Sequence, residues 1–359
     1  MRTRILVAAA VTVAAAPLAA QAPRLYLTNQ DDATVSILDP ATRRLIETLD
    51  LQRLGFAANA RPHHAQVEPD GSFWYLTLIG AGKVLKLDRD NRIVGSVDLE
   101  VPGLMALHPT RDLLVVARSM SAVNPPRRIA LVRRSDMTLL DEYEVVFPRP
   151  HALVVDPRGE YVYVGSLGEN QLASVRLEDG GTHLVNVDGP PLTLVQFAVS
   201  PDARWLAATA QTGNELLVFD IADPAAPRLA RRIPMNRGPF EPGFTYDGRL
   251  IYVTNFDANT LTSVRTDTWA IANVIQGPGF GQPHGVALSP DGQRVFVSNR
   301  HQAGGAHEHE GRQPTGHGTV VAVCIATATV DTVLEVGNYA AGMGTPVPVT
   351  RPGDPRPCR

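Results

Sequence analysis

The amino-acid sequence predicts an all-β fold, a seven-bladed β-propeller of four-stranded antiparallel blades. Three observations predict it. A turn motif repeats with a blade-sized period, short β-rich runs follow each turn, and the end of the chain supplies the strand that its beginning lacks. No segment sustains the 3.6-residue apolar period of a long helix.

The repeat is marked by the turn PDG and its variants. Counted from the proline, or from Tyr246 in its place, successive copies are 40, 48, 44, 45 and 44 residues apart. Such a period is typical of a propeller blade. The copies are EPDG (68–71), HPTRD (108–112), DPRGE (156–160), SPDAR (200–204), TYDGR (245–249) and SPDGQR (289–294).

Each turn is followed by alternating runs such as FWYLT from Phe73 and IYVTN from Ile251, separated by Gly, Asn or Asp. Such runs predict antiparallel strands joined by tight hairpins. LYLTN, from Leu25, has no turn or first strand before it, and VGNYAAGMGTPVPV (336–349) fits the missing strand. A C-terminal strand that completes the N-terminal blade closes the ring and removes its open edges. We therefore expect one propeller over residues 23–350.

The first residues have the layout of a secretory signal. Arg2 and Arg4 precede an apolar run, and small residues surround two possible cleavage points, after Ala20 and after Ala22. No later run is long enough to cross a bilayer. We expect a signal peptide over 1–22, export to the periplasm or the extracellular space, and a C-terminal tail over 351–359.

Charge and cysteine content narrow the function further. The 359 residues carry a formal net charge of −3, so binding to a nucleic-acid backbone is not expected. The two cysteines, Cys324 and Cys358, can form a disulfide in an exported chain and tie the tail to the body. Two unpaired thiols are the alternative.

The runs LYLTN, IYVTN and VFVSN, the turns NQDDAT and NFDANT, and SPDG resemble the YVTN-type β-propeller family over nearly the whole mature chain. The resemblance implies the fold and an exported or cell-surface location. Related propellers include surface-layer proteins, lactonase-like enzymes, a periplasmic protein that binds nucleic acid, and copper- or cytochrome-carrying oxidoreductases. The resemblance therefore does not choose a function.

Three histidines share one register of the predicted first strands. His63, His151 and His284 each follow a proline and stand six residues before the proline of the turn. First strands line the channel of a propeller, so the three imidazoles could form a facial ligand set for one Zn, Cu or Fe ion. The structural alternative is an imidazole that hydrogen-bonds the backbone of a neighbouring blade.

Four further residues extend this candidate site. His64 and Glu241 are candidates for a fourth ligand or a catalytic acid or base, although strict strand alternation turns them away from the axis. Arg61 and Arg149 precede two of the prolines and suit a carboxylate or phosphate ligand. Surface salt bridges are the alternative for both arginines.

A histidine-rich insertion lies at the same end of the predicted channel. Asn29 and Thr34 are 5 residues apart, whereas Asn299 and Thr319 are 20 apart, so the last blade carries 15 extra residues between its second and third strands. They could bind a metal or close over the channel, and a solvated loop is the alternative. The candidate ligands are His301, His307, His309 and His317.

No other catalytic motif is present. The sequence has no G-x-S-x-G elbow, P-loop, nucleotide-binding G-x-G-x-x-G or haem-attaching C-x-x-C-H. We expect a binding protein with a small-molecule or transition-metal site in the channel. One alternative is a metal-dependent enzyme that uses the same histidines, either an oxidoreductase or a lyase or lactonase-like enzyme. A second alternative is a scaffold that binds an envelope protein.

Overall fold

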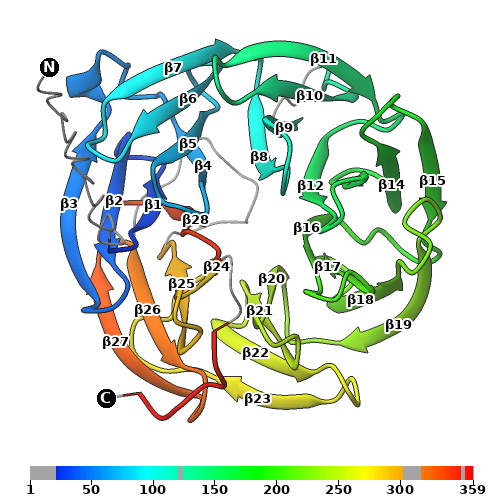
Figure 1. Cartoon of the computed structure of the whole chain (residues 1–359). Helices are drawn as coiled ribbons and strands as arrows, with labels where there is room; N and C mark the ends of the chain where they lie inside the picture. Colours follow the sequence, from blue (N-terminus) through cyan, green and yellow to red (C-terminus); the bar gives the residue numbers. More distant parts are fainter. Residues whose placement is uncertain (1–21, 120–123, 302–316, 349–351, 359) are drawn as a thin grey trace, which may run out of the picture.

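The computed structural model describes residues 22–119, 124–301, 317–348 and 352–358. These residues form seven four-stranded antiparallel sheets around a central channel, as Figure 1 shows. The predicted seven-bladed propeller is confirmed. The helical element in the described part of the chain is a single 3-10 turn, η1 (Gln52–Leu54).

The strands of each blade follow one another from the channel outward. Blades 1 to 3 consist of β28 (Ala340–Gly344), β1 (Leu25–Asn29), β2 (Thr34–Asp39), β3 (Arg44–Asp50); β4 (Pro62–Val67), β5 (Phe73–Leu78), β6 (Lys83–Asp88), β7 (Ile93–Asp98); β8 (Pro102–Leu107), β9 (Leu113–Arg118), β10 (Arg128–Arg133), β11 (Thr138–Glu144). Blades 4 and 5 consist of β12 (Pro150–Val155), β13 (Tyr161–Ser166), β14 (Gln171–Arg176), β15 (Thr182–Asn186); β16 (Leu194–Val199), β17 (Trp205–Ala210), β18 (Glu215–Asp220), β19 (Arg228–Pro234). Blades 6 and 7 consist of β20 (Pro239–Phe244), β21 (Leu250–Asn255), β22 (Thr260–Arg265), β23 (Ile271–Ile275); β24 (Pro283–Leu288), β25 (Arg294–Asn299), β26 (Thr319–Cys324), β27 (Thr329–Glu335).

The ring closes as the sequence predicts. Strand β28, from the end of the chain, pairs antiparallel with β1, and Leu27 lies opposite Met343. The N-terminal blade therefore gains its innermost strand from the other end of the chain. This closure leaves no gap between first and last blades for another chain to pair with.

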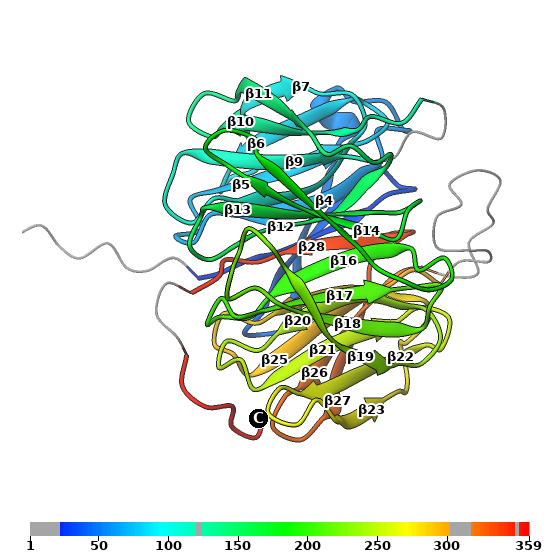
Figure 2. The same ribbon diagram turned by 90° about the vertical axis from the view of Figure 1, so that its right-hand side faces the viewer.

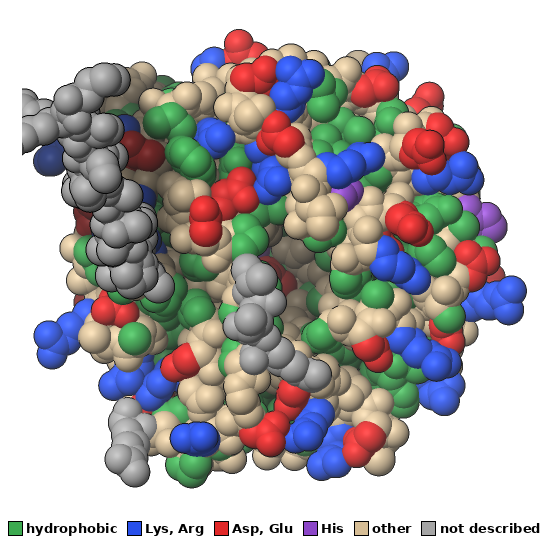
Figure 3. All heavy atoms as spheres, in the orientation of Figure 1, with side chains coloured by type: hydrophobic (Ala, Val, Ile, Leu, Met, Phe, Trp, Pro, Cys, Tyr) green, Lys and Arg blue, Asp and Glu red, His purple; other side chains and the backbone are tan. Residues whose placement is uncertain are grey.

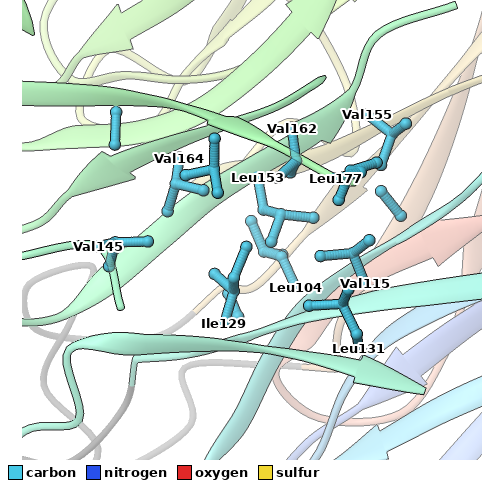
Figure 4. Packing of buried hydrophobic residues seen from close by; sticks show 14 of the residues in the cluster. Leu104, Val115, Ile129, Leu131, Val145, Leu153, Val155, Val162, Val164 and Leu177 are labelled. Atoms are coloured by element: carbon cyan, nitrogen blue, oxygen red, sulfur yellow. The ribbon is translucent and has the colours of Figure 1, made fainter. Parts of the chain in front are cut away.

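The core lies between neighbouring blades. The middle strands of each blade are buried on both faces and read as continuous apolar runs, whereas the outermost strands are largely exposed. Figure 4 shows one such layer, where Leu104, Val115 and Ile129 of blade 3 meet Leu153 and Val162 of blade 4. Burying each such side chain stabilises the fold by about 1.5–3 kcal/mol.

The recurring Asn at the end of the second strand fixes the following hairpin. Asn29 Nδ2 donates to the hydroxyls of Thr34 and Ser36, at 2.9 Å each. Asn255 Nδ2 donates in the same way to Thr260 and Thr262, at 3.0 and 2.8 Å. The Asn of the repeat is therefore a hairpin clamp.

The two ends of the channel differ. All inner strands begin at one end, here called the histidine end, and the C-terminal tail packs on the opposite face, the tail end (Figure 2). A disulfide joins Cys358 in the tail to Cys324 on β26, as expected, and Arg249 pairs with Asp354. No helix in the described ranges is long and apolar enough to span a bilayer. The predicted signal, apart from Ala22, lies outside those ranges.

Candidate functional site

A β-bulge at the start of every inner strand shapes the histidine end. Pro62 lies opposite Leu78 but Ala65 lies opposite Leu76, so His63 and His64 share the place of one residue. The other six inner strands show the same shift. Bulges break the alternation of side chains. The inner strands therefore do not keep the strict alternation on which the expected orientation of His64 and Glu241 depends.

Buried hydroxyl groups on the second strands hold the bulges. Thr209 Oγ1 accepts a hydrogen bond from Gln196 N at 3.2 Å and donates to Phe240 O of the next blade at 2.6 Å. Thr254 links Glu241 N to His284 O in the same way, at 3.0 Å each. Ser298 repeats both bonds between blades 7 and 1. The hydroxyl of the YVTN-like run thus couples each bulge to its neighbour.

The residue before every inner strand has a left-handed backbone. The φ values are 51° at Arg61, 55° at Arg149 and 52° at Gln282, and the same region is occupied by Val101, Thr193, Gly238 and Tyr339. For residues other than glycine this conformation costs on the order of 1 kcal/mol or more. It brings the chain into each inner strand at the same angle, so that side chains at one register meet around the axis.

The three predicted histidines lie in one ring, but they do not converge on one point. Each is 3% exposed. The rings of His63 and His151 are 5.8 Å apart between centroids, whereas His284 packs against Phe240 at 4.3 Å. In the described part of the chain, no group of three or more His, Cys, Asp or Glu side chains is arranged to hold a metal ion.

Hydrogen bonds fix the orientation of the imidazoles. His63 Nδ1 lies 2.7 Å from Gln30 Nε2, and His151 Nδ1 donates to Val195 O at 2.8 Å. His64 Nδ1 accepts a hydrogen bond from Met105 N at 3.1 Å. His151 therefore hydrogen-bonds the backbone of a neighbouring blade, which is the structural alternative to a ligand role, and His64 does the same.

Burial and nearby cations keep two imidazoles neutral. Desolvation and the adjacent His151 lower the pKa of His64 to about 4. The pKa of His151 is also lowered to about 4, by desolvation and by the charges of Arg149 and Arg300. Both rings are therefore uncharged near pH 7.

Arg300 was not predicted as a site residue. Its guanidinium is buried and lies 4.0 Å from the ring centroid of Tyr339, 5.5 Å from that of Phe256 and 5.7 Å from that of Phe240. Such cation–π contacts hold a cation in an apolar setting. Arg300 is the first residue after the second strand of blade 7, and Gln30 is the first residue after the second strand of blade 1. An alignment of the repeats at this position could have identified Arg300 as a candidate site residue.

Arg149 is half-buried at the histidine end. Burial lowers its pKa, and its Nε is buried without a hydrogen-bond partner. No ion pair in the described residues includes it. Arg61 holds the equivalent position in blade 2 and is also half-buried. The salt bridges expected as an alternative are therefore not seen for Arg149.

The histidine-rich insertion is described only at its two ends. His301 Nε2 lies 3.1 Å from Gly279 O and 3.1 Å from Thr319 Oγ1, which anchors the start of the insertion to blade 7. His317 is exposed. The candidates His307 and His309 lie outside the described residues. Strands β25 and β26 meet at the histidine end, the end predicted for the insertion.

Surface depressions of about 550 and 860 Å³ lie beside the C-terminal tail. Turn residues and the tail itself form them, and Arg249, Arg356 and Cys358 are in their walls. None of the candidate site residues lines either depression.

Comparisons with known proteins show a likeness of fold. No protein-family model matches the sequence, and a search of curated proteins finds no match. Among solved structures, the periplasmic gluconolactonase of Pseudomonas aeruginosa has a TM-score of 0.69 at 18% identity and covers 90% of this chain and 98% of its own. A proposed 6-phosphogluconolactonase of Bacteroides uniformis has a TM-score of 0.68 at 13% identity, with 90% and 100% covered. A streptogramin B lyase has a TM-score of 0.64 at 15% identity, with 79% and 92% covered.

At these sequence identities the comparisons show a shared fold and do not show a shared function. The chain is a seven-bladed propeller whose structural neighbours include lactonases and a lyase. The YVTN-type resemblance remains one of short sequence runs.

Proposed function

We propose that this propeller binds a small organic anion at the histidine end of its channel. The observation that carries the proposal is Arg149, a partly desolvated guanidinium that makes no ion pair and leaves its buried Nε without a partner within the described residues. A carboxylate or phosphate group is the natural partner for such a cation, because guanidinium donates two parallel hydrogen bonds to it.

The surroundings of Arg149 suit such a ligand. The positive charges of Arg149 and Arg300 both lower the pKa of His151. Two guanidinium groups therefore act on the space around this imidazole. The neighbouring ring positions carry an apolar cluster of Leu167, Val195, Phe240 and Phe256. A positively charged end beside an apolar cluster favours a carboxylate with an apolar body over a bare inorganic anion.

Calorimetric titration tests this proposal. Acetate, benzoate, gluconate and inorganic phosphate are titrated into the purified chain, into Arg149→Gln and into Arg231→Gln. Arg231 is a matched control, because it is exposed on the outer strand β19 and bonds only a neighbouring carbonyl. We expect Arg149→Gln to weaken binding at least about tenfold, the loss of one charge-assisted contact. Equal affinity in all three proteins, or no binding of any anion, contradicts the proposal.

A lactonase-like reaction is a second candidate and would use the same residues. Ring opening of a lactone develops negative charge on the carbonyl oxygen and yields an organic anion, and Arg149 could stabilise both. The Nε2 of neutral His151, the ring nitrogen that does not donate to Val195 O, could accept the proton of the attacking water. The lactonase-like fold supports this candidate.

Turnover tests the lactonase candidate. Gluconolactone opening is followed by acid release, and we expect a rate above that of buffer that falls in Arg149→Gln and in His151→Gln. A wild-type rate equal to that of buffer sets lactone opening aside, whereas anion binding remains testable by calorimetry.

A transition-metal site is a third candidate, favoured by the approach of His63 to His151 and of His64 to His151. These three residues have the ligand chemistry for Zn, Cu or Fe. The test is the metal content of protein purified without a His tag, compared with a His63→Ala/His64→Ala/His151→Ala variant and with a deletion of residues 301–315. Loss in the triple variant supports a channel site, and loss only in the deletion moves the site to the insertion.

We propose that the protein is exported, on the layout of its first residues and on its disulfide. Fractionation of expressing cells tests this proposal. Recovery of a chain shortened by about 20 residues from the periplasm or medium is the expected outcome, and a full-length cytoplasmic chain contradicts it.

A further inference from the structure

The channel has a solvent-accessible lumen beyond the histidines. On β20, Glu241 and Gly243 are partly exposed, whereas Phe240, Pro242 and Phe244 are buried. Because β20 is the innermost strand of its blade, the solvent that reaches these two residues is in the channel. Partly exposed residues on other inner strands extend the same lining: Gln66, Val154 and Ala198.

The lumen opens toward the tail end. The inner strands run from the histidine end to the tail end, and the three histidines near their starts are 3% exposed, whereas Arg61 and Arg149 outside them are half-buried. Figure 3 views the molecule from the side of the C-terminal tail and shows a hollow near the centre of that face. Because the partly exposed lining residues follow the buried histidine register along the inner strands, we infer that Glu241 is approached from this face, opposite the one that carries Arg149.

Polar groups around Glu241 are uncharged. Gln196 Nε2 lies 3.3 Å from Glu241 Oε2, and the backbone of Val286 also hydrogen-bonds the carboxyl group. The strands packed against β20 are β16, β17, β21 and β24, and none of them carries a lysine or arginine. Their ionisable side chains are Tyr252 on β21 and His284 on β24.

From this arrangement we propose that the lumen binds a small organic ammonium ion, with the Glu241 carboxylate as its counter-ion. The amide oxygen of Gln196, whose Nε2 lies 3.3 Å from Glu241 Oε2, is a further acceptor of the kind that an ammonium group needs. The apolar Val154, Ala198 and Gly243 leave room for a short hydrocarbon body. This site is separate from the anion site, and neither depends on the other.

Binding should release a proton. Although part of Glu241 is exposed, the channel lining desolvates its carboxyl and raises the pKa to about 8, so the carboxyl is mostly protonated at pH 7 in the free protein. An ammonium ion favours the charged carboxylate and lowers that pKa. Each binding event at pH 7 then displaces close to one proton from Glu241 to the buffer.

Calorimetry at pH 7 in phosphate and in MOPS measures both affinity and proton release, because the observed heat differs by the ionisation enthalpy of the buffer. Methylammonium, ethanolamine and choline are titrated as chlorides, with sodium and potassium chloride at equal ionic strength. We expect saturable binding of at least one ammonium ion, with close to one proton released. Binding without proton release, or equal binding of sodium or potassium, overturns the proposal.

Glu241→Gln gives the second test. The substitution keeps the size of the side chain and its contact with Gln196 but removes the negative charge, and we expect a loss of ammonium binding of at least about tenfold. Glu169→Gln makes the same change of charge at an exposed position and should bind as the wild type does. Unchanged affinity in Glu241→Gln also overturns the proposal, and the proton count in the wild type is independent of how the variant folds.

Discussion

The imidazole rings of His63 and His151 lie 5.8 Å apart, although their strands, β4 and β12, belong to blades that a third blade separates. The residue at the same register of the blade between them is Gly103. A Cβ at Gly103 would lie 2.6 Å from Ser119 Oγ, so its own blade closes the position to larger residues. Two side chains of the ring thus meet although their blades are not adjacent.

Acid should destabilise the fold through His151. The pKa of this residue is about 4 in the folded chain and near 6.5 when exposed, so its contribution to stability is complete above pH 6.5 and is lost as the pH falls toward 4. We expect the unfolding free energy of the wild type to fall by about 3 kcal/mol more than that of His151→Gln between pH 7 and pH 4. Urea titrations measure it. His183→Gln, at an exposed position, should follow the wild type, and parallel curves for wild type and His151→Gln contradict the prediction.

The contribution of Glu241 to stability should have the opposite pH dependence. Its pKa of about 8 lies above the value for an exposed glutamate, so its contribution is complete below pH 4.5 and is lost as the pH rises through 8. Between pH 6.5 and 8 we expect the unfolding free energy of the wild type to fall by up to about 2 kcal/mol more than that of Glu241→Gln. Thermal and urea unfolding measured at both pH values check this, and a wild type whose stability does not change relative to Glu241→Gln refutes it.

The hydroxyl of Thr209 should stabilise two blades. Replacing it by the isosteric valine leaves Gln196 N–H and Phe240 C=O buried without that partner. We expect Thr209→Val to lower the unfolding free energy by about 2–3 kcal/mol, as measured by urea denaturation. Thr209→Ser keeps the hydroxyl and should lose less. A larger loss in the serine variant shows that the methyl group, not the hydrogen bonds, is what matters.

The disulfide should hold the tail on its face. Cys324 and Cys358 are separated by 34 residues, and closing a loop of that length stabilises a fold by about 3–4 kcal/mol. We expect Cys358→Ser to unfold at a lower temperature and to lose its tail to limited proteolysis. Dithiothreitol should have this effect on the wild type and none on the variant. Equal protease resistance of both proteins under both conditions speaks against the prediction.

Much of the fold could be predicted from repeats in the sequence. The spacing of the turns and the alternation of LYLTN, IYVTN and VFVSN identify seven blades, and the missing first strand identifies the closure by Ala340–Gly344. These features are local, because each strand carries its own period and each turn its own residues. The shared register of His63, His151 and His284 was found in the same way and holds in the structure.

The candidate site could be predicted only in part. The shared register of the histidines predicts that they lie in one ring. It does not predict that the imidazoles of His63 and His151 contact each other while that of His284 packs against Phe240. The burial of Arg300 among Tyr339, Phe256 and Phe240 depends on side chains from neighbouring repeats, which no single repeat displays. The alternation assumed for Glu241 does not hold, because a bulge is an irregularity of pairing that leaves no period in the sequence.

The sequence by itself determined the architecture, the register of the inner strands, the cysteine pair and the position of the insertion, since short-range periodicity and spacing specify them. Only the tertiary structure decided which side chains of different blades touch and which remain in contact with solvent. The physical reason is that seven similar strands meet around one axis, where bulges and the charges of Arg149 and Arg300 act between blades. These contacts give His151 its neutral ring and Glu241 its raised pKa, and the proposed functions rest on them.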